Sequence, residues 1–200
     1  MLDAMTDAVD ADLRYTAERY FELLKAGLIA EDDHVELLEG IIVAEPPQDP
    51  PHATATMMVI EALRNAVGKH AIVRSQLPLV VSEYSVPEPD VAVVAGRISD
   101  YAHVHPTTAL LVVEIAASSL PKDRLSKSRI YAAAGIPEYW VVNLRDNCVE
   151  VFRQPAAAIR QYADRTVAQR GDRLSLVMLP DAQVSVDDLL LPGTEEPCEV

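Results

Sequence analysis

Apolar residues in this chain form short runs between polar, proline-containing or glycine-containing segments, and two of the runs are nearly unbroken. These two cover 109–115 and 138–143, and such runs are typical of strands buried on both faces of a sheet. Shorter runs predict the other strands, the last two of them peripheral: 35–44 (two strands around Gly40), 71–73, 77–81, 90–95, 148–153, 159–162 and 173–177.

Apolar positions at helical spacing predict three helices. The first covers 17–26, with Thr16 as its N-cap and Gly27 as the residue that ends it. The second covers 52–68 and the third covers 121–134. Because helices and strands are interleaved, the order predicts an α/β or α+β domain with a mixed central sheet flanked by helices.

The distribution of charge sets the expected limits of the domain. The formal net charge is −14, but residues 1–12 carry four acids and 181–200 carry six, with no Lys or Arg in either segment. The segment 13–180 therefore holds 21 acids against 17 bases, a net of −4. We expect one domain over 13–190 between acidic tails, a disordered one at 1–12 and a second at 191–200. The overall acidity argues against a simple nucleic-acid binder, whereas the nearly neutral body leaves a polyanionic substrate open.

The composition also indicates where the protein works. No run of about 18 apolar residues could span a membrane, and the acidic N-terminus lacks the basic start of a signal peptide. Cys148 and Cys198 have no disulfide or zinc spacing. We expect a cytoplasmic protein with no membrane partner.

Two acids stand out because they lie in apolar strands. Asp90 opens one predicted strand, and Glu114 interrupts the near-continuous run at 109–115. A buried carboxylate is costly unless it is paired, hydrogen-bonded or bound to a metal. Asp90 alone also fits a residue that caps a strand start, and Glu114 fits a salt bridge with Arg124 or Lys127.

Both acids together suggest a metal site. Mg²⁺ takes one or two carboxylates and completes its shell with waters and phosphate oxygens. Such an ion polarises a phosphodiester and lowers the pKa of a bound water. Lys127, on the helix predicted after Glu114, would neutralise transition-state charge or orient the attacking water. Asp90, Glu114 and Lys127 thus predict phosphodiester cleavage with Mg²⁺ or Mn²⁺.

The segment 122–129 carries four bases and one acid in an otherwise acidic chain. One interpretation places Lys127 towards the carboxylates while Lys122 and Arg124 meet a phosphate backbone. The other is a solvated helix face with an Asp123–Lys127 pair.

Four further residues are weaker candidates. Glu36 is a third acid that a neighbouring element could supply, and Glu39 is equally well placed by spacing alone. His52 follows a proline-rich loop, where a histidine is most often a helix-start residue. Gln76, expected in a strand region, is a candidate for the same cleft.

Several motifs over about 16–190 occur in the order of a known family. The most specific covers Tyr131-Ala-x-x-Gly-Ile-Pro-Glu-Tyr-Trp-Val-Val142. The others are Glu36-Leu-x-x-Gly40, Pro51-His52, Gln76-x-Pro78, Glu88-Pro-Asp90, Leu-Val-Val-Glu114 and Asp123-Arg-x-x-Lys127. With these motifs the chain resembles the Uma-two family of restriction endonucleases, within the PD-(D/E)XK nuclease superfamily.

The resemblance implies a restriction-endonuclease-like core in which Asp90 and Glu114 are metal ligands and Glu36 is an accessory acid. The superfamily often places its lysine two residues after the second acid, where this chain has Ala116. The resemblance therefore assigns the lysine role to Lys127.

The chain departs from the family pattern at two places beside the expected site. Residues 117–120 read Ala-Ser-Ser-Leu where many members have Ser-Pro-Ser-Thr, and Asn143 stands where an aspartate is common. Neither change removes an expected ligand.

These observations give one leading hypothesis and two alternatives. The first is a Mg²⁺- or Mn²⁺-dependent DNA endonuclease, acting as a homodimer so that two sites reach two strands. One alternative is a catalytically inactive binding or assembly protein with the nuclease fold, which the overall acidity favours and the intact acid–acid–lysine set disfavours. The other is a hydrolase that acts on RNA.

Overall fold

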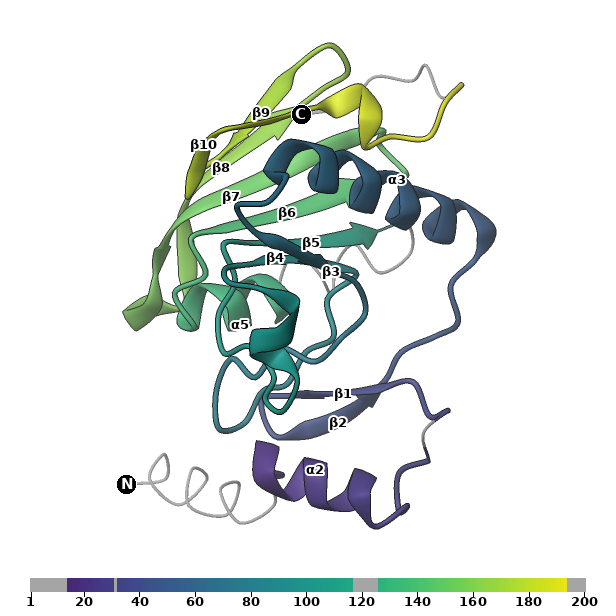
Figure 1. Ribbon diagram of the computed structural model, residues 1–200, viewed down its shortest axis with the longest axis vertical. Coiled ribbons are helices and arrows are strands. Elements are labelled where there is room, and N and C mark those ends of the chain that lie inside the picture. Colours follow the sequence, from purple (N-terminus) through teal and green to yellow (C-terminus); the bar gives the residue numbers. More distant parts are fainter. Residues whose placement is uncertain (1–13, 31, 117–125, 194–200) are drawn as a thin grey trace, which may run out of the picture.

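A six-stranded mixed sheet forms the centre of the protein in the computed structural model, which describes residues 14–30, 32–116 and 126–193 (Figure 1). Strands β5 and β6 pair in parallel, and every other pair of neighbours in this sheet is antiparallel. The predicted mixed central sheet is confirmed. In spatial order the strands are β3 (Ile72–Arg74), β4 (Val91–Val94), β5 (Leu111–Ala116), β6 (Glu138–Asn143), β7 (Cys148–Ala156) and β8 (Gln161–Ala168).

The two central strands arise from the near-continuous apolar runs. Every residue of β5 and β6 is buried. Because successive side chains of a strand point to opposite faces, Val113 and Ile115 pack into one core cluster, whereas Val112 and Ala116 pack into the cluster on the other face. Glu114, which lies between Val113 and Ile115 in β5, therefore shares a face with Val112.

Helix α3 (Pro50–Val67) covers the face of Val113 and Ile115, together with the hairpin of β9 (Arg173–Leu176) and β10 (Leu179–Ser185) (Figure 1). This helix begins two residues before the predicted start at 52. The side chain of Asp49 accepts the backbone N–H of His52, and the first two helical positions are prolines, which fit there because those N–H groups have no helical partner.

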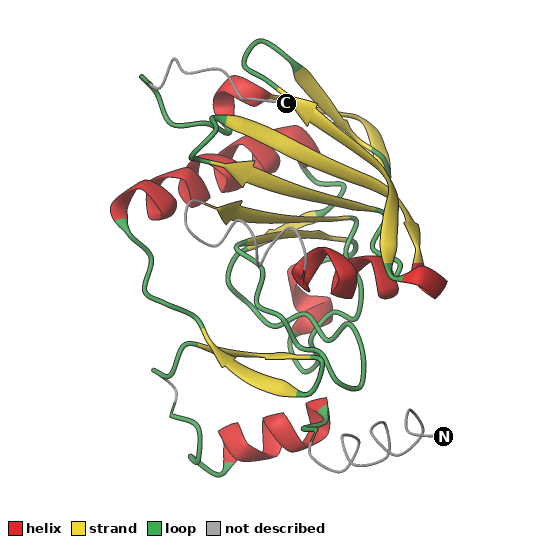
Figure 2. Cartoon of the chain, turned by 180° about the vertical axis from the view of Figure 1, so that it is seen from behind, coloured by secondary structure: helices red, strands yellow, loops and turns green. Residues whose placement is uncertain are grey.

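Helix α5 (Ser128–Ala133) covers the opposite face, and Figure 2 shows it on the side of the sheet away from α3. It belongs to the crossover that the parallel pair β5–β6 requires. The predicted helix over 121–134 is confirmed only for its described part, in which a π-type turn at Ser126 and Lys127 leads into α5. Residues 121–125 lie outside the described part of the chain.

A smaller layer lies beyond the sheet and holds α2 (Ala17–Lys25) and the hairpin of β1 (Val35–Leu38) and β2 (Ile41–Ala44) (Figure 1). The predicted cap is confirmed, since Thr16 accepts the backbone N–H of Arg19 at 3.1 Å. The hairpin is anchored where Leu37 and Val86 exchange backbone hydrogen bonds. These hydrogen bonds hold β1 next to the loop that precedes β4.

Two strand predictions need correction, and one strand was not predicted. The stretch 77–81 is not a strand, because Gln76 has a φ of 50° and the following residues bond to loop backbone, as Leu79 does to Pro87. The strand predicted at 159–162 is the start of the longer β8, after the 3-10 turn η3 (Ala157–Ile159). Strand β10 was not predicted, since only two of its seven residues are fully buried.

The remaining short elements are the 3-10 turns η1 (Ile98–Tyr101) and η4 (Val186–Asp188). The predicted tail at 1–12 and residues 194–200 of the other lie outside the described ranges. Within those ranges, no helix combines the length and the apolar character needed to cross a bilayer.

Candidate active site

Asp90 and Glu114 lie side by side on neighbouring strands. The register pairs Val91 with Val113, so the residue before β4 falls opposite Glu114. The backbone N–H of Asp90 donates to Glu114 Oε2 at 3.4 Å, and Asp90 Oδ2 accepts the N–H of Ile115 at 2.8 Å. The side chains of both acids therefore lie next to each other on one face of the sheet, where the interior strand β4 begins.

Glu114 is only 3% exposed, and its carboxylate is held on two sides. Its Oε1 atom accepts the hydroxyl of Tyr131 at 2.8 Å and lies 3.1 Å from Lys127 Nζ. These contacts explain how a carboxylate is tolerated inside an apolar strand. Burial, followed by the charges of Glu114 and Glu36, raises the pKa of Tyr131 well above its usual value, so its hydroxyl stays a donor.

Lys127 is the cation of this cluster and is 4% exposed. Its Nζ atom lies 3.1 Å from Glu114, 3.4 Å from Glu36 Oε2 and 3.6 Å from Glu45 Oε1. The π-type turn at Ser126 and Lys127 precedes α5, and such local widenings of a helix are frequent at functional sites. The structure thus brings the predicted lysine to the predicted acids.

The structure places Glu36 and Glu39 in different surroundings. Glu36 is fully buried on β1, and its Oε2 atom accepts the backbone N–H of Glu88 at 3.3 Å. Glu39 lies in the hairpin turn with a φ of 51° and forms ion pairs with Arg129 and Arg160. Of these two acids, only Glu36 contacts Lys127.

His52 also reaches the site, from the first turn of α3. Its Nε2 atom lies 3.2 Å from Asp90 Oδ2. Burial lowers the pKa of His52, but the hydrogen bond and charge of Asp90, the backbone of Ile115 and the charge of Asp49 outweigh it, so the pKa is raised above 6.5. His52 is therefore both a helix-start residue and a neighbour of the site.

Gln76, by contrast, is not brought to the site. Gln76 is exposed, and it is held through its backbone N–H, which donates to Pro89 O at 3.0 Å. Its predicted place on a strand is wrong, because its positive φ follows the end of β3. Lys122 and Arg124 lie outside the described residues, so their predicted contacts with phosphates stay predictions.

The prediction from sequence missed three residues that contact the acids or the lysine. Gln48 Nε2 donates to Asp90 Oδ1 at 3.2 Å, and Glu45 lies beside Lys127. Both come from the proline-rich linker between β2 and α3, where no periodic pattern indicates direction. Tyr131 follows Lys127 by four residues and so shares its helix face, a signal that was present in the sequence.

Among the residues that the structure describes, negative charge dominates this cluster. Five carboxylates of the described residues gather at the site of Lys127: Glu36, Glu45, Glu88, Asp90 and Glu114. Burial raises the pKa of Glu88; the charge of Glu45 adds to this effect, whereas His34 and Lys127 oppose it. Such an excess of acids favours a bound cation.

The donor set fits a divalent ion that prefers oxygen. Asp90 and Glu114 supply carboxylate oxygens, the ligands of Mg²⁺ and Mn²⁺. Among the described residues, no three His, Cys, Asp or Glu side chains are arranged to hold a metal by themselves. An ion here would thus rest on one or two carboxylates and complete its shell with water and substrate oxygens, which is the usual manner of Mg²⁺.

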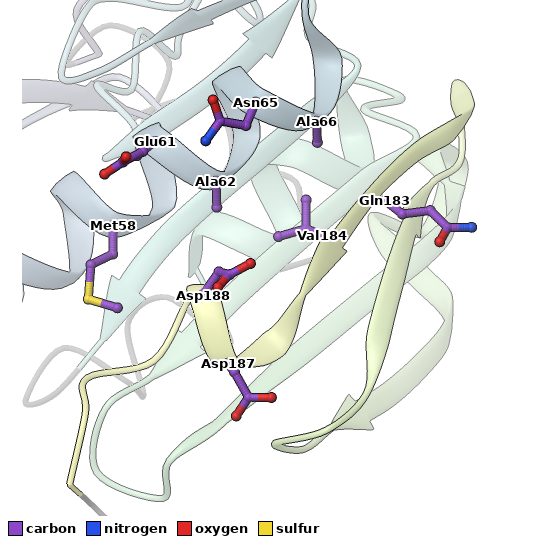
Figure 3. Close-up of a pocket in the computed structure, with 9 residues that line it drawn as sticks. All are labelled: Met58, Glu61, Ala62, Asn65, Ala66, Gln183, Val184, Asp187 and Asp188. Carbon is purple, nitrogen blue, oxygen red and sulfur yellow. The ribbon is translucent and has the colours of Figure 1, made fainter.

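A hollow of about 500 Å³ lies elsewhere, between α3 and the β10–η4 segment (Figure 3). It is on the sheet face opposite Glu114, and no basic residue is among those that line it. Its lining is Met58, Glu61, Ala62, Asn65, Ala66, Gln183, Val184, Asp187 and Asp188. We therefore place the candidate chemistry at the buried acids and Lys127, where charged groups lie close together, rather than in this hollow.

Comparisons with known proteins agree with the fold and the motifs. The model of the Uma2 (Uma-two) family, described as "Putative restriction endonuclease", matches residues 17–187. A crystal structure of a putative nuclease belonging to DUF820 from Anabaena variabilis superposes with a TM-score of 0.67 at 16% identity, over 87% of this chain and 96% of that one. No curated protein matches the chain. The resemblance deduced from the motifs is confirmed.

Proposed function

This chain belongs to the Uma2 family of putative restriction endonucleases, and on that basis we propose that it is a metal-dependent DNA endonuclease that hydrolyses phosphodiester bonds. The observation that carries the proposal is the contact set of two adjacent acids and a buried lysine, with Glu114 Oε1 3.1 Å from Lys127 Nζ. A nuclease-like fold supports the same assignment.

Each residue of the site has a role that its contacts support. Asp90 and Glu114 would hold Mg²⁺ or Mn²⁺, which when bound polarises the phosphodiester and activates a water. Asp90 is oriented by the Ile115 N–H and by His52, and Glu114 is oriented by Tyr131. These contacts fix the carboxylate oxygens before substrate arrives, which limits the reorganisation needed at the moment of reaction.

Lys127 would stabilise negative charge on the scissile phosphate. Its ammonium group has three protons to donate and already lies among three carboxylates. Glu36 holds this ammonium from the β1 side, so we assign it the part of an accessory acid that positions Lys127. Cutting both strands of a duplex needs two such sites, and we propose a homodimer, which light scattering would detect.

The most direct test is cleavage of supercoiled plasmid with Mg²⁺ or Mn²⁺. Asp90→Asn, Glu114→Gln and Lys127→Met should each slow cleavage by about 10²-fold or more. Glu61→Gln, an exposed acid of α3 on the opposite face, is the matched control and should cut as the parent does. If the three site variants cut as well as the parent, the assignment fails.

Two outcomes would favour the alternatives. If calorimetry detects no Mg²⁺ or Mn²⁺ binding and no nucleic acid is cut, the chain is a binding or assembly protein that retains the fold. Its net charge of −14 favours this alternative. If a labelled RNA is cut and DNA of the same sequence is not, the substrate is RNA.

A further inference from the structure

Arg74 lies on the same face of the sheet as the candidate catalytic acids. It ends the edge strand β3 and pairs with Ala92, two residues after Asp90. Since Ala92 pairs in turn with Val112, these positions share the face that carries Glu114. Strand geometry puts the Cα atoms of Arg74 and Asp90 about 8 Å apart.

The guanidinium of Arg74 is held against an aromatic ring. Its Cζ atom lies 5.5 Å from the centroid of Tyr101 in η1, within the range of a cation–π contact. Tyr101 is itself fixed, because its hydroxyl donates to Ala95 O at 2.8 Å. The start of η1 is capped by Asp100, which accepts the backbone N–H of Arg97 at 2.9 Å. The Tyr101 ring that contacts Arg74 is therefore itself held in place by hydrogen bonds.

Arg74 differs from most arginines of the described chain in its partners. Seven of them form ion pairs with carboxylates: Arg19, Arg97, Arg129, Arg153, Arg160, Arg165 and Arg170. Arg74 is partly buried and forms no ion pair with a carboxylate of the described residues. Burial lowers its pKa, yet a guanidinium remains charged at neutral pH. A fixed, partly desolvated cation of this kind favours an anionic ligand.

The surroundings of Arg74 add ring surfaces and no described acid. His105 stacks on Phe21 of α2, with ring centroids 5.4 Å apart and planes 10° from parallel. Burial, and then the positive charge of Arg74, lower the pKa of His105, so this imidazole is neutral at pH 7. A guanidinium held against an aromatic ring suits a surface that contacts nucleic acid, where Arg side chains and aromatic rings act together.

We propose that Arg74, supported by Tyr101, binds a backbone phosphate of the nucleic acid and so positions the strand over Asp90 and Glu114. This inference rests on the proposed function. It also answers an electrostatic difficulty, because the cluster of five carboxylates repels a polyanion.

The test measures binding separately from cleavage, by fluorescence anisotropy of a labelled DNA duplex over a series of salt concentrations with Ca²⁺ present. Arg74→Gln should weaken binding about fivefold to tenfold and reduce the slope of log K against log salt by about 0.7–0.9, the loss of one phosphate contact. Arg74→Lys should keep the slope and lose part of the affinity, since it retains charge without the planar group.

Arg173→Gln is the matched control, because it removes one positive charge from β9, which packs on the opposite face. It should bind as the parent does. If Arg74→Gln melts like the parent and binds no more weakly than Arg173→Gln, the phosphate site is disproved. Plasmid cleavage separates the two proposals. If Arg74→Gln binds DNA more weakly but the parent cuts no plasmid, the phosphate site at Arg74 is upheld and the nuclease assignment is overturned. If the parent cuts plasmid and Arg74→Gln cuts it with an unchanged KM, the nuclease assignment is upheld and the phosphate site is overturned.

Discussion

At the scale of single residues, the hydroxyl of Tyr131 orients the Glu114 carboxylate through a direct hydrogen bond. It donates to Glu114 Oε1 at 2.8 Å in a fully buried setting. Tyr131→Phe should lower the free energy of unfolding by about 1–3 kcal/mol, because it removes a donor from a buried carboxylate. It should also lower kcat for plasmid cleavage, because Glu114 loses its orientation.

Tyr162→Phe is the matched control for that change. Its hydroxyl donates to Ile136 O at 2.9 Å, away from the acids, so it should lower stability without lowering kcat. Urea unfolding and cleavage rates measure the two effects. Equal losses of kcat in both variants would mean that Tyr131 acts only through stability.

The pKa of His105 reports on the charge of Arg74 nearby. The native pKa of His105 lies below its ordinary value of 6.5, through burial and then the charge of Arg74. The native state thus binds this proton less tightly than the unfolded state. The corresponding stability is fully present above pH 6.5 and is lost as the pH falls towards the native pKa.

Arg74→Gln should move the pKa of His105 upward, towards 6.5, because one of its two causes is removed. NMR titration of the imidazole ring measures this shift, and Arg173→Gln should leave the midpoint unchanged. A midpoint that stays in place in Arg74→Gln would show that the guanidinium does not face His105.

The sequence identified Asp90, Glu114 and Lys127 because charged residues in or beside apolar runs are conspicuous. Gln48 and Glu45 were not predicted, since their contacts with Asp90 and Lys127 depend on the path of the linker between β2 and α3, and no local sequence pattern encodes that path. The choice between Glu36 and Glu39 was open for the same reason. It depends on which residue of the hairpin reaches Lys127, a tertiary property.

At the scale of elements, the β1–β2 hairpin supplies Glu36 and depends on its glycine turn. Gly40 has a φ of 86°, and a Cβ there would lie 2.6 Å from Arg14 Cβ and 3.2 Å from Arg14 Cα. Gly40→Ala should therefore cost both backbone strain and displacement of the segment before α2.

Gly27→Ala separates these two costs. Gly27 has a φ of 67°, and a Cβ added there would meet no atom of the described residues within 4 Å beyond its chain neighbours. This variant should therefore lose only about 1 kcal/mol of unfolding free energy, and Gly40→Ala should lose about 1–3 kcal/mol more. Urea denaturation of both variants measures the difference, and equal losses would show that the contact with Arg14 is not maintained.

Strands that are buried on both faces of the sheet could be predicted from the sequence. Strands β5 and β6 followed from near-continuous apolar runs, because a central strand has no solvent face. The segment 77–81 has a similar apolar character, but the turn at Gln76 and the missing N–H of Pro78 prevent regular pairing. Strand β10 has only two buried residues among its seven and is recognisable only from its pairing with β9.

At the scale of the whole molecule, the acidic balance is the least expected property for a nuclease. The net charge is −14, and much of it lies in the terminal segments. The remaining acids include the five carboxylates at the site of Lys127, so charge concentrates where the metal is proposed. The protein would then depend on a divalent ion for its charge balance as well as for its chemistry.

We propose that Asp90 and Glu114 hold this ion beside Lys127. Crystals grown with Mn²⁺ and measured for anomalous scattering would locate it. We expect an ion within about 2.0–2.3 Å of an oxygen from each acid, with Lys127 still near Glu114. Crystals saturated with Mn²⁺ that show no ion between these carboxylates, while Lys127 keeps its contacts with Glu36, Glu45 and Glu114, would contradict it.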